Sequence, residues 1–147
     1  MPLPPFDPSG RLPPGTHWAT WGDIAGRFGG GTHRQQLLEG LRLVCENLRQ
    51  AGCPTVFIDG SFVTAKARPA DFDGCWDPVG VNFDHIDPVL LDFTGRRAAQ
   101  KERYGGEMFV AGASADHLGN TFLEFFQIDK ETGDGKGIVA LDLRSEP

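Results

Sequence analysis

Residues 55–76 read TVFIDGSFVTAKARPADFDGCW and contain the most informative pattern in the chain. The run from Thr55 to Asp59 is rich in β-branched and aromatic residues, which predicts a buried strand. Gly60 and Ser61 follow at once, and a glycine there lets the backbone come close to a ligand. Exposed N–H groups at such a turn hold phosphates well, and the serine hydroxyl can add one hydrogen bond. The pair is therefore a candidate phosphate site, although Gly-Ser after a strand is usually only a turn.

Asp71 and Asp73 flank Phe72 in a second predicted strand, over residues 71–76. Side chains at positions i and i+2 of a strand share a face and lie roughly 7 Å apart, because each residue rises about 3.3 Å. Two carboxylates so placed repel each other unless a cation lies between them. Mg²⁺ meets that need, since it takes one or two carboxylates and fills its other positions with water and phosphate oxygens. Alone, an Asp-x-Asp pair also occurs by chance in many proteins.

The two patterns together resemble the signature of the polymerase-beta-like nucleotidyltransferase superfamily: a hydrophobic strand, Gly-Ser, nine residues, then Asp-apolar-Asp. In that superfamily the serine contacts the phosphates of the nucleotide, and the two acids bind the metal ions. The resemblance implies a nucleotidyltransferase fold, a nucleoside triphosphate substrate, and Mg²⁺ or Mn²⁺ as cofactor. It also implies that Asp71 and Asp73 are metal ligands and that Gly60 and Ser61 hold the nucleotide.

A narrower resemblance covers nearly the whole chain. An uncharacterised bacterial clade of small nucleotidyltransferase-like proteins carries F-x-D-G-S-F-V-T-x-K-x-x-P-x-D-hydrophobic-D, which residues 57–73 match in register. The clade also has Asp-Pro-Val-Leu-Leu-Asp-Phe, Phe-Phe-Gln and Lys-Gly-Ile-Val segments, found here at residues 87–93, 125–127 and 136–139. Some members are encoded as suspected toxin or antitoxin-like components, which implies a toxin–antitoxin or defence role, with a protein partner, as one option.

A third carboxylate is needed in active members of the superfamily, where it binds one metal ion and deprotonates the attacking hydroxyl. Paired strands lie about 4.8 Å apart, so this acid should lie in the next strand, expected over residues 107–111. Glu107 fits best as this catalytic and metal-binding acid. Most relatives would have aspartate there, and glutamate reaches one methylene further, so an edge-strand surface glutamate is the alternative.

Thr64 and Lys66 lie between the serine and the acids and are predicted to help bind the nucleotide. A lysine at this point could meet a triphosphate as a point charge. A solvated loop lysine is an equally good interpretation of the same residue.

Helices and strands alternate along the rest of the predicted chain. Thr20 is expected to cap a short helix that ends at Phe28, and apolar residues three and four apart predict a long helix over residues 32–51. A polar helix is expected around residues 96–104. The order predicts an α+β (α/β-type) sandwich, with a small mixed β-sheet flanked by helices.

The two ends of the chain complete this expectation. Residues 1–17 hold six of the eleven prolines and are expected to form an extended surface arm. Ser114 is expected to cap a helix that includes Phe122, Phe125 and Phe126, and a last strand is predicted over residues 137–143.

Length and composition set further bounds. At 147 residues the chain is expected to be a single domain, 1–147, and its formal net charge of −6 argues against strong nonspecific binding to nucleic acid. The local group Arg96, Arg97, Lys101 and Arg103 is interpreted as a basic patch or, more simply, as a solvated helix face. The three cysteines lack C-x-x-C spacing, and neither a membrane-spanning run nor a signal peptide pattern is present, so a cytoplasmic protein without a membrane partner is expected.

Three functions remain open from the sequence. The leading hypothesis is metal-dependent transfer of a nucleoside monophosphate from a nucleoside triphosphate to an unidentified hydroxyl acceptor, such as an RNA end, a protein or a small molecule. The alternative is a catalytically degenerate nucleotidyltransferase fold that acts as a nucleotide- or protein-binding module. A metal-dependent nuclease ranks last, because clustered acids alone leave the Gly-Ser turn unexplained.

Overall fold

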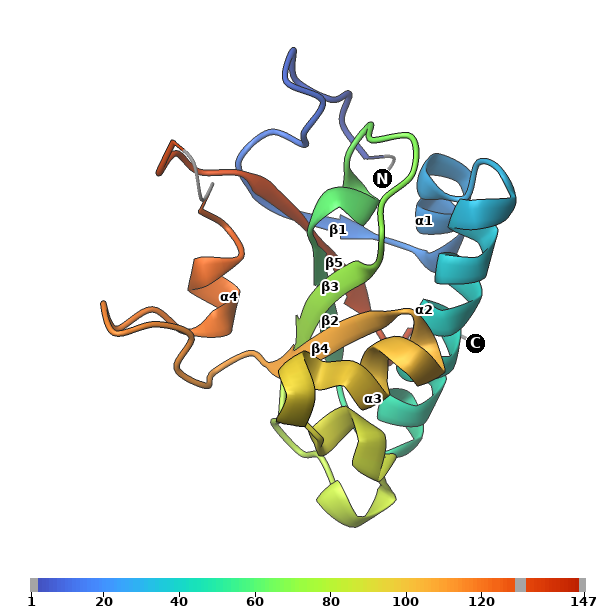
Figure 1. The fold of residues 1–147 in the computed structure, drawn as a ribbon, viewed down its shortest axis with the longest axis vertical. Helices are drawn as coiled ribbons and strands as arrows, with labels where there is room; N and C mark the ends of the chain where they lie inside the picture. Colours follow the sequence, from blue (N-terminus) through green and yellow to red (C-terminus); the bar gives the residue numbers. More distant parts are fainter. Residues whose placement is uncertain (1–2, 129–131, 146–147) are drawn as a thin grey trace.

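The computed structural model describes residues 3–128 and 132–145, which contain a five-stranded mixed sheet (Figure 1). Its strands are β1 (Gly15–Ala19), β2 (Thr55–Asp59), β3 (Phe72–Trp76), β4 (Gly106–Val110) and β5 (Gly137–Asp142), in the spatial order β1-β5-β2-β3-β4. β2 pairs antiparallel with both β5 and β3, whereas β1 with β5 and β3 with β4 are parallel pairs. The α+β class and the mixed sheet that the sequence predicts are therefore confirmed.

Helices lie on both sides of this sheet, but unequally. Three of them, α1 (Trp21–Phe28), α2 (Thr32–Gln50) and α3 (Thr94–Tyr104), pack on one face, and the single turn α4 (Phe122–Phe125) lies on the other (Figure 1). Short 3-10 turns occupy Ser61–Val63, Phe83–His85 and Pro88–Leu91. None of the helices in the described part of the chain is long and apolar enough to cross a membrane.

The face covered by three helices holds the main core. Alternate strand residues point to it, as the two-residue period of a strand requires, and meet the apolar stripe of α2. Its fully buried members include Val56, Ile58, Val139, Leu41, Val44 and Leu48. α2 and α3 approach closely at Gly40, where a Cβ atom would lie 1.7 Å from the Tyr104 carbonyl oxygen. Only glycine fits that contact.

The opposite face has a smaller core. Cys75 in β3 and Ile138 in β5 are fully buried there and form a cluster with Ala111 and Phe126. Several half-buried rings around α4 pack against this cluster, namely Phe57, Phe109, Phe122 and Phe125. Among the described helices, α4 is the one that lies on this face.

Two sequence-based predictions at the ends need correction. Residues 15–17 of the predicted surface arm lie in β1, because its backbone pairs with the otherwise unpaired edge of β5. Leu12, also in the predicted arm, is only 1% exposed, and its carbonyl accepts a hydrogen bond from the Gly137 amide. An apolar residue and a free strand edge thus hold this segment against the sheet.

The helix predicted after Ser114 begins later and is shorter. Asp116 instead accepts hydrogen bonds from the Leu118 and Asn120 amides, which closes a turn before the helix. α4 starts after Thr121, where Thr121 and Glu124 form a capping box. The turn chemistry of Asp116 overrides the helical spacing of the later phenylalanines. By contrast, the predicted cap of α1 at Thr20 is confirmed, with Asp23 completing a capping box.

Candidate functional site

Three acids form one row across the sheet. Asp59 in β2 is the register partner of Asp73 in β3, and Asp73 is the register partner of Glu107 in β4. Directly opposed residues of paired strands project from the same face, so the three carboxyls lie side by side on the face that α4 only partly covers. Asp71 directly precedes β3. The strands therefore bring together the two acids of the Asp-x-Asp pair and the predicted third acid, and add Asp59, which the sequence reasoning left out.

Gly60 lets the turn after β2 come against this row. Its φ of +80° is unfavourable for other residues, and a Cβ atom there would lie 2.3 Å from Oδ2 of Asp73. A glycine is thus required both by the backbone conformation and by the closeness of the carboxyl. The turn and the acids form one compact site.

A buried arginine holds the loop that follows. Arg34 of α2 is 7% exposed, and its guanidinium donates to four backbone carbonyls: Phe28 at 3.1 Å, Phe62 at 2.7 Å, Thr64 at 2.9 Å and Lys66 at 2.6 Å. Three of the four lie between Ser61 and Asp71, so Arg34 fixes the path of the chain between them. The sequence reasoning missed this residue, yet its position is four residues before Leu38 and seven before Leu41, on the apolar stripe of α2.

The predicted nucleotide-binding residues of the loop differ in their positions. The Thr64 hydroxyl donates to the Ser61 carbonyl at 2.7 Å and accepts from the Lys66 amide at 3.2 Å, which tightens the turn. Ser61 and Thr64 line a cavity beside the acids, whereas the exposed Lys66 does not line it. Lys66 still lies near enough to Asp71 to counteract the rise in that carboxyl's pKa.

Two adjoining cavities open over the acids. One, of about 340 Å³, is lined mainly by the turn and the loop: Arg11, Leu12, Asp59, Gly60, Ser61, Val63, Thr64, Asp73, Lys136 and Gly137. The other, of about 320 Å³, is lined by acids, cations and rings: Asp59, Gly60, Asp73, Arg97, Glu107, Phe109, Ala115, Phe122, Phe125, Phe126, Ile128 and Lys136. Asp59, Gly60, Asp73 and Lys136 belong to both. The cavities therefore adjoin along these four residues, and we treat them together as one cleft.

The electrostatics of the row favour a proton or a cation. Burial, together with the neighbouring Asp71 and Glu107 carboxyls, raises the pKa of Asp73 to about 8. The pKa of Asp71 is also raised, first by burial and then by Glu107. A carboxyl with a raised pKa in a cleft is a common sign of a functional site, because the fold holds like charges together at a cost in stability.

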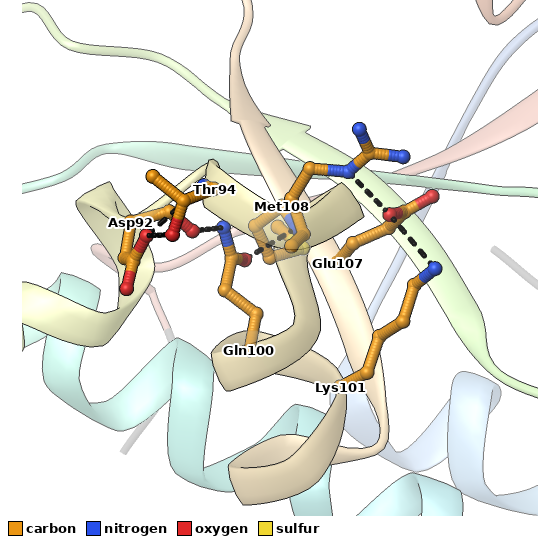
Figure 2. Close-up of polar contacts among 7 residues, drawn as sticks. Asp92, Thr94, Gln100, Lys101, Glu107 and Met108 are labelled. Atoms are coloured by element: carbon orange, nitrogen blue, oxygen red, sulfur yellow. Dashed lines mark hydrogen bonds and ion pairs between the residues drawn. The ribbon is translucent and has the colours of Figure 1, made fainter.

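Cations hold the outer acids of the row. Glu107 accepts from Arg97 Nε at 2.7 Å and lies 3.7 Å from Lys101 Nζ (Figure 2). Burial acts to raise the pKa of Glu107, but hydrogen bonds from Arg97 and Asp73 outweigh it, so the net pKa is lowered. At the other end, Lys136 Nζ lies 3.3 Å from Asp59 Oδ1. Lys136 and Arg97 are thus site cations to which the sequence reasoning gave no role in the site.

The acids of the site are of the type that binds a divalent cation, although their side chains are not arranged as a complete coordination site. Among residues 3–128 and 132–145, no group of three or more His, Cys, Asp and Glu side chains could hold a metal ion as those side chains lie. Glu107 and Asp59 turn toward Arg97 and Lys136, which lie close to their carboxyls. The donor set is nonetheless all carboxylate, which is the set that Mg²⁺ or Mn²⁺ takes, and the pKa values of Asp71 and Asp73 are raised first by burial and then by neighbouring negative charge.

Gln100 fixes the strand that carries Glu107. It is fully buried in α3, and its amide joins α3 to two neighbouring segments (Figure 2). Nε2 donates to the Asp92 carbonyl at 3.4 Å, and Oε1 accepts from the Met108 amide at 2.8 Å. The backbone next to Glu107 is therefore held by a side chain from the helix that also supplies Arg97 and Lys101.

The start of α3 has an unusual backbone. Gly95, Arg96 and Arg97 have φ values of 58°, 57° and 61°, in the left-handed region. For the two arginines this conformation is unfavourable. Arg97 is the last of these three residues. Its guanidinium donates a hydrogen bond to Glu107 and lies 5.3 Å from the centre of the Phe109 ring.

The model of a family of unknown function, DUF6932, matches residues 4–142. Comparison with curated proteins and with solved structures gave no match. The matched range includes the acid row, the Gly60 turn, Arg34, Lys136 and all five strands.

Proposed function

The chain belongs to DUF6932, a family of unknown function, and from the geometry of its site we propose that it is a metal-dependent nucleotidyltransferase. It would move a nucleoside monophosphate from a nucleoside triphosphate to a hydroxyl acceptor. The observation that carries the proposal is the acid row of Asp59, Asp73 and Glu107 beside the Gly60-Ser61 turn, with the pKa of its central carboxyl raised to about 8.

The arrangement of elements supports a nucleotidyltransferase fold. The resemblance of the sequence requires Gly-Ser directly after one strand, the acid pair on the neighbouring strand, and the third acid on the strand after that. Here Gly60 and Ser61 follow β2, Asp71 and Asp73 lie at β3, and Glu107 lies on β4. β2, β3 and β4 are consecutive in the sheet, so the three features meet at one point.

The cavity at the Gly60 turn suits the triphosphate. Ser61 can donate its hydroxyl, and Arg11 and Lys136 line the same cavity as cations. Lys136 is the better candidate than Lys66 for the phosphate charge, because Lys136 lines both cavities and Lys66 lines neither. A triphosphate that arrives there would compete with Asp59 for Lys136.

The reaction would be an in-line displacement at the α-phosphorus. The acceptor oxygen forms a new bond to that phosphorus while the bond to the bridging oxygen breaks, and pyrophosphate leaves with the bonding electrons. Glu107 would accept the proton of the acceptor hydroxyl: its lowered pKa keeps the carboxylate ionised, although it also makes the carboxylate a weaker base. Asp71 and Asp73, with Glu107, would hold Mg²⁺ or Mn²⁺, which supplies charge neutralisation and a lower pKa for the acceptor hydroxyl.

Binding and transfer can be tested separately. Thermal unfolding is measured with each nucleoside triphosphate, with and without Mg²⁺ or Mn²⁺, on the wild type, Asp71→Asn, Asp73→Asn and the control Asp142→Asn. Asp142 is on the same sheet face but at its far end, where it pairs with Arg144. A ligand at 100 times its Kd adds about 2.7 kcal/mol, a shift of several degrees for a chain of this size.

The expected result is a metal-dependent shift in the wild type and in Asp142→Asn that both acid variants lose. Label from an α-³²P nucleotide should then appear on an acceptor in step with pyrophosphate release. Absence of a shift with every nucleotide, or full transfer by Asp73→Asn, would sink the proposal.

The second candidate is a nucleotide- or protein-binding module on the same fold. The observation in its favour is that Arg97 and Lys101 form ion pairs with Glu107, so the charge of the third acid is neutralised within the chain. A nucleotide shift without pyrophosphate release, in the wild type and in Arg97→Ala, would favour this candidate over transfer. Release of pyrophosphate would exclude it as the whole function.

A further inference from the structure

The two halves of the cleft differ in chemistry. Arg11, Ser61 and Thr64 line only the half at the Gly60 turn, whereas Phe109, Phe122, Phe125 and Phe126 line only the other half, together with Arg97 and Glu107. Asp73 lies where the two halves meet, because it is one of the four residues that line both cavities. The proposed transfer uses the polar half and the acids, and leaves the aromatic half without a role.

The aromatic wall is an ordered stack. The Phe109 and Phe122 rings are nearly parallel, with centroids 4.2 Å apart and an interplanar angle of 12°. Phe126 packs against both at 5.9 Å and 5.8 Å and is nearly fully buried, so it supports the other two. Arg97 lies over Phe109 from the side of the acids.

Two rings of the wall remain partly open to the cavity. Phe122 and Phe125 are half-buried and line it, and both come from the turn α4, which lies on the side of the sheet opposite α1, α2 and α3 (Figure 1). Flat rings that line a cavity beside a cation offer stacking surface to a planar ligand.

We propose that this aromatic half of the cleft is the subsite for the base of the donor nucleotide, with Phe122 and Phe125 as its stacking residues. The inference rests on the proposed function and adds the position of the nucleoside to it. A nucleoside triphosphate has a polyanionic end and a flat aromatic end, and its α-phosphorus lies between the two. The cleft has the same order: polar wall, Asp73, aromatic wall.

The order also fixes the direction of the donor. With the triphosphate tail at Ser61 and Lys136, the α-phosphorus lies at the acid row and the base extends toward α4. In the reverse direction the base would lie among Arg11, Ser61 and Thr64, away from the four phenylalanine rings, which line only the other cavity. Rings read any base by its face, so the subsite predicts weak discrimination among the four bases.

The test compares ligands with and without a base. Binding of ATP, GTP, CTP and UTP, and of inorganic tripolyphosphate, is measured by calorimetry with Mg²⁺ in excess. The variants are Phe122→Leu and Phe125→Leu, which keep apolar volume and remove the flat ring. Phe83→Leu is the matched control, because Phe83 is exposed, lines neither cavity and packs against Trp76 instead.

We expect each nucleotide to bind at least tenfold more tightly than tripolyphosphate, and each ring variant to lose roughly tenfold in nucleotide affinity. Tripolyphosphate should bind the wild type, both ring variants and Phe83→Leu equally, which shows that the variants fold and keep the polar half. Equal affinity of the wild type for nucleotides and tripolyphosphate would overturn the subsite, as would unchanged nucleotide binding in both ring variants. Binding of neither ligand class would overturn the proposed function itself, so the two failures are distinct.

Discussion

The two faces of the sheet are built from the same strands, but one face holds the main core and the other holds the acid row. On the helix-covered face, β2 contributes Val56 and Ile58, which are fully buried under α2. On the other face the same strand contributes Phe57, which packs against the small core, and Asp59, which lines the cleft. One closed face supplies the stability, and it supports a second face on which acids are held together.

The second face has its own order of rows. Asp59, Asp73 and Glu107 form one row, and the next row two residues along carries Phe57, Cys75 and Phe109. In this setting burial and the neighbouring carboxyls raise the pKa of Asp73, the central acid of the row. Repulsion of this kind is unfavourable for folding and useful for binding a cation. Substitutions in the core should therefore destabilise the chain, whereas removal of a crowded acid should stabilise it.

The largest expected difference between the faces comes from matched leucines. Leu41 in α2 is fully buried in the main core, whereas Leu123 in α4 is only partly buried against the small one. Leu41→Ala should lower the free energy of unfolding by about 3 kcal/mol, since it leaves a cavity, and Leu123→Ala by about 1 kcal/mol. Urea denaturation of both variants measures this, and equal losses would contradict the contrast between closed and open faces.

Gln100 links the two faces and should come next. It lies in α3 on the closed side, and it accepts a hydrogen bond from the Met108 amide beside Glu107. Gln100→Leu should cost about 2 kcal/mol, because the buried Met108 amide loses its acceptor. Gln50→Leu, at an exposed position of α2, is the control and should change the unfolding free energy by less than about 0.5 kcal/mol. Loss of nucleotide transfer beyond the loss of stability would show that Gln100 also positions Glu107.

The stability of the folded chain should also depend on pH. The folded chain raises the pKa of Asp73 to about 8, first through burial and then through Asp71. Between about pH 4 and pH 8 the folded state therefore holds more protons than the unfolded state, so stability falls as the pH rises. Glu107, with its lowered pKa, adds stability that is lost only below this window.

Urea unfolding of the metal-free chain from pH 5 to pH 8 tests this. A net shift of one pKa unit corresponds to about 1.4 kcal/mol. Asp73→Asn should flatten the profile and raise stability at pH 8. The range stops there because the buried thiols of Cys53 and Cys75, whose pKa values are raised to about 11 and about 12, affect the curve at higher pH. A wild-type stability that rises from pH 5 to pH 8 would contradict the crowding of the acids.

The sequence predicted the parts of this site that follow local rules. The two strands around the Gly60 turn, the acid pair and the strand with Glu107 all follow from apolar runs, turn residues and spacing. The predicted nucleotide role of Lys66 stays a prediction, since the exposed side chain lies near Asp71 without lining the cleft. Short stretches of sequence were therefore enough to predict these elements.

The parts that were missed depend on pairing between distant segments. Lys136 reaches Asp59 because β5 lies beside β2, a neighbourhood that no local pattern reveals. β1 was missed for the same reason, since only the edge of β5 makes a strand of residues 15–19. Arg34 is different, because its place on the apolar stripe of α2 could have marked it as a buried cation in need of acceptors.

The smallest effect concerns the backbone that brings Arg97 to the open face. Arg96 is exposed and has a left-handed φ of 57°, which costs roughly 1–2 kcal/mol for a residue with a Cβ atom. Glycine removes that strain but adds about 0.5–1 kcal/mol of unfolded-state entropy, so Arg96→Gly should stabilise the chain by roughly 0.5 kcal/mol. Glu102→Gly, at an exposed and regular position of the same helix, should instead destabilise it by about 1 kcal/mol. Thermal unfolding of the two variants side by side measures the difference. If Arg96→Gly destabilises the chain as much as Glu102→Gly does, the left-handed turn is unstrained, and the delivery of Arg97 to Glu107 carries no conformational cost.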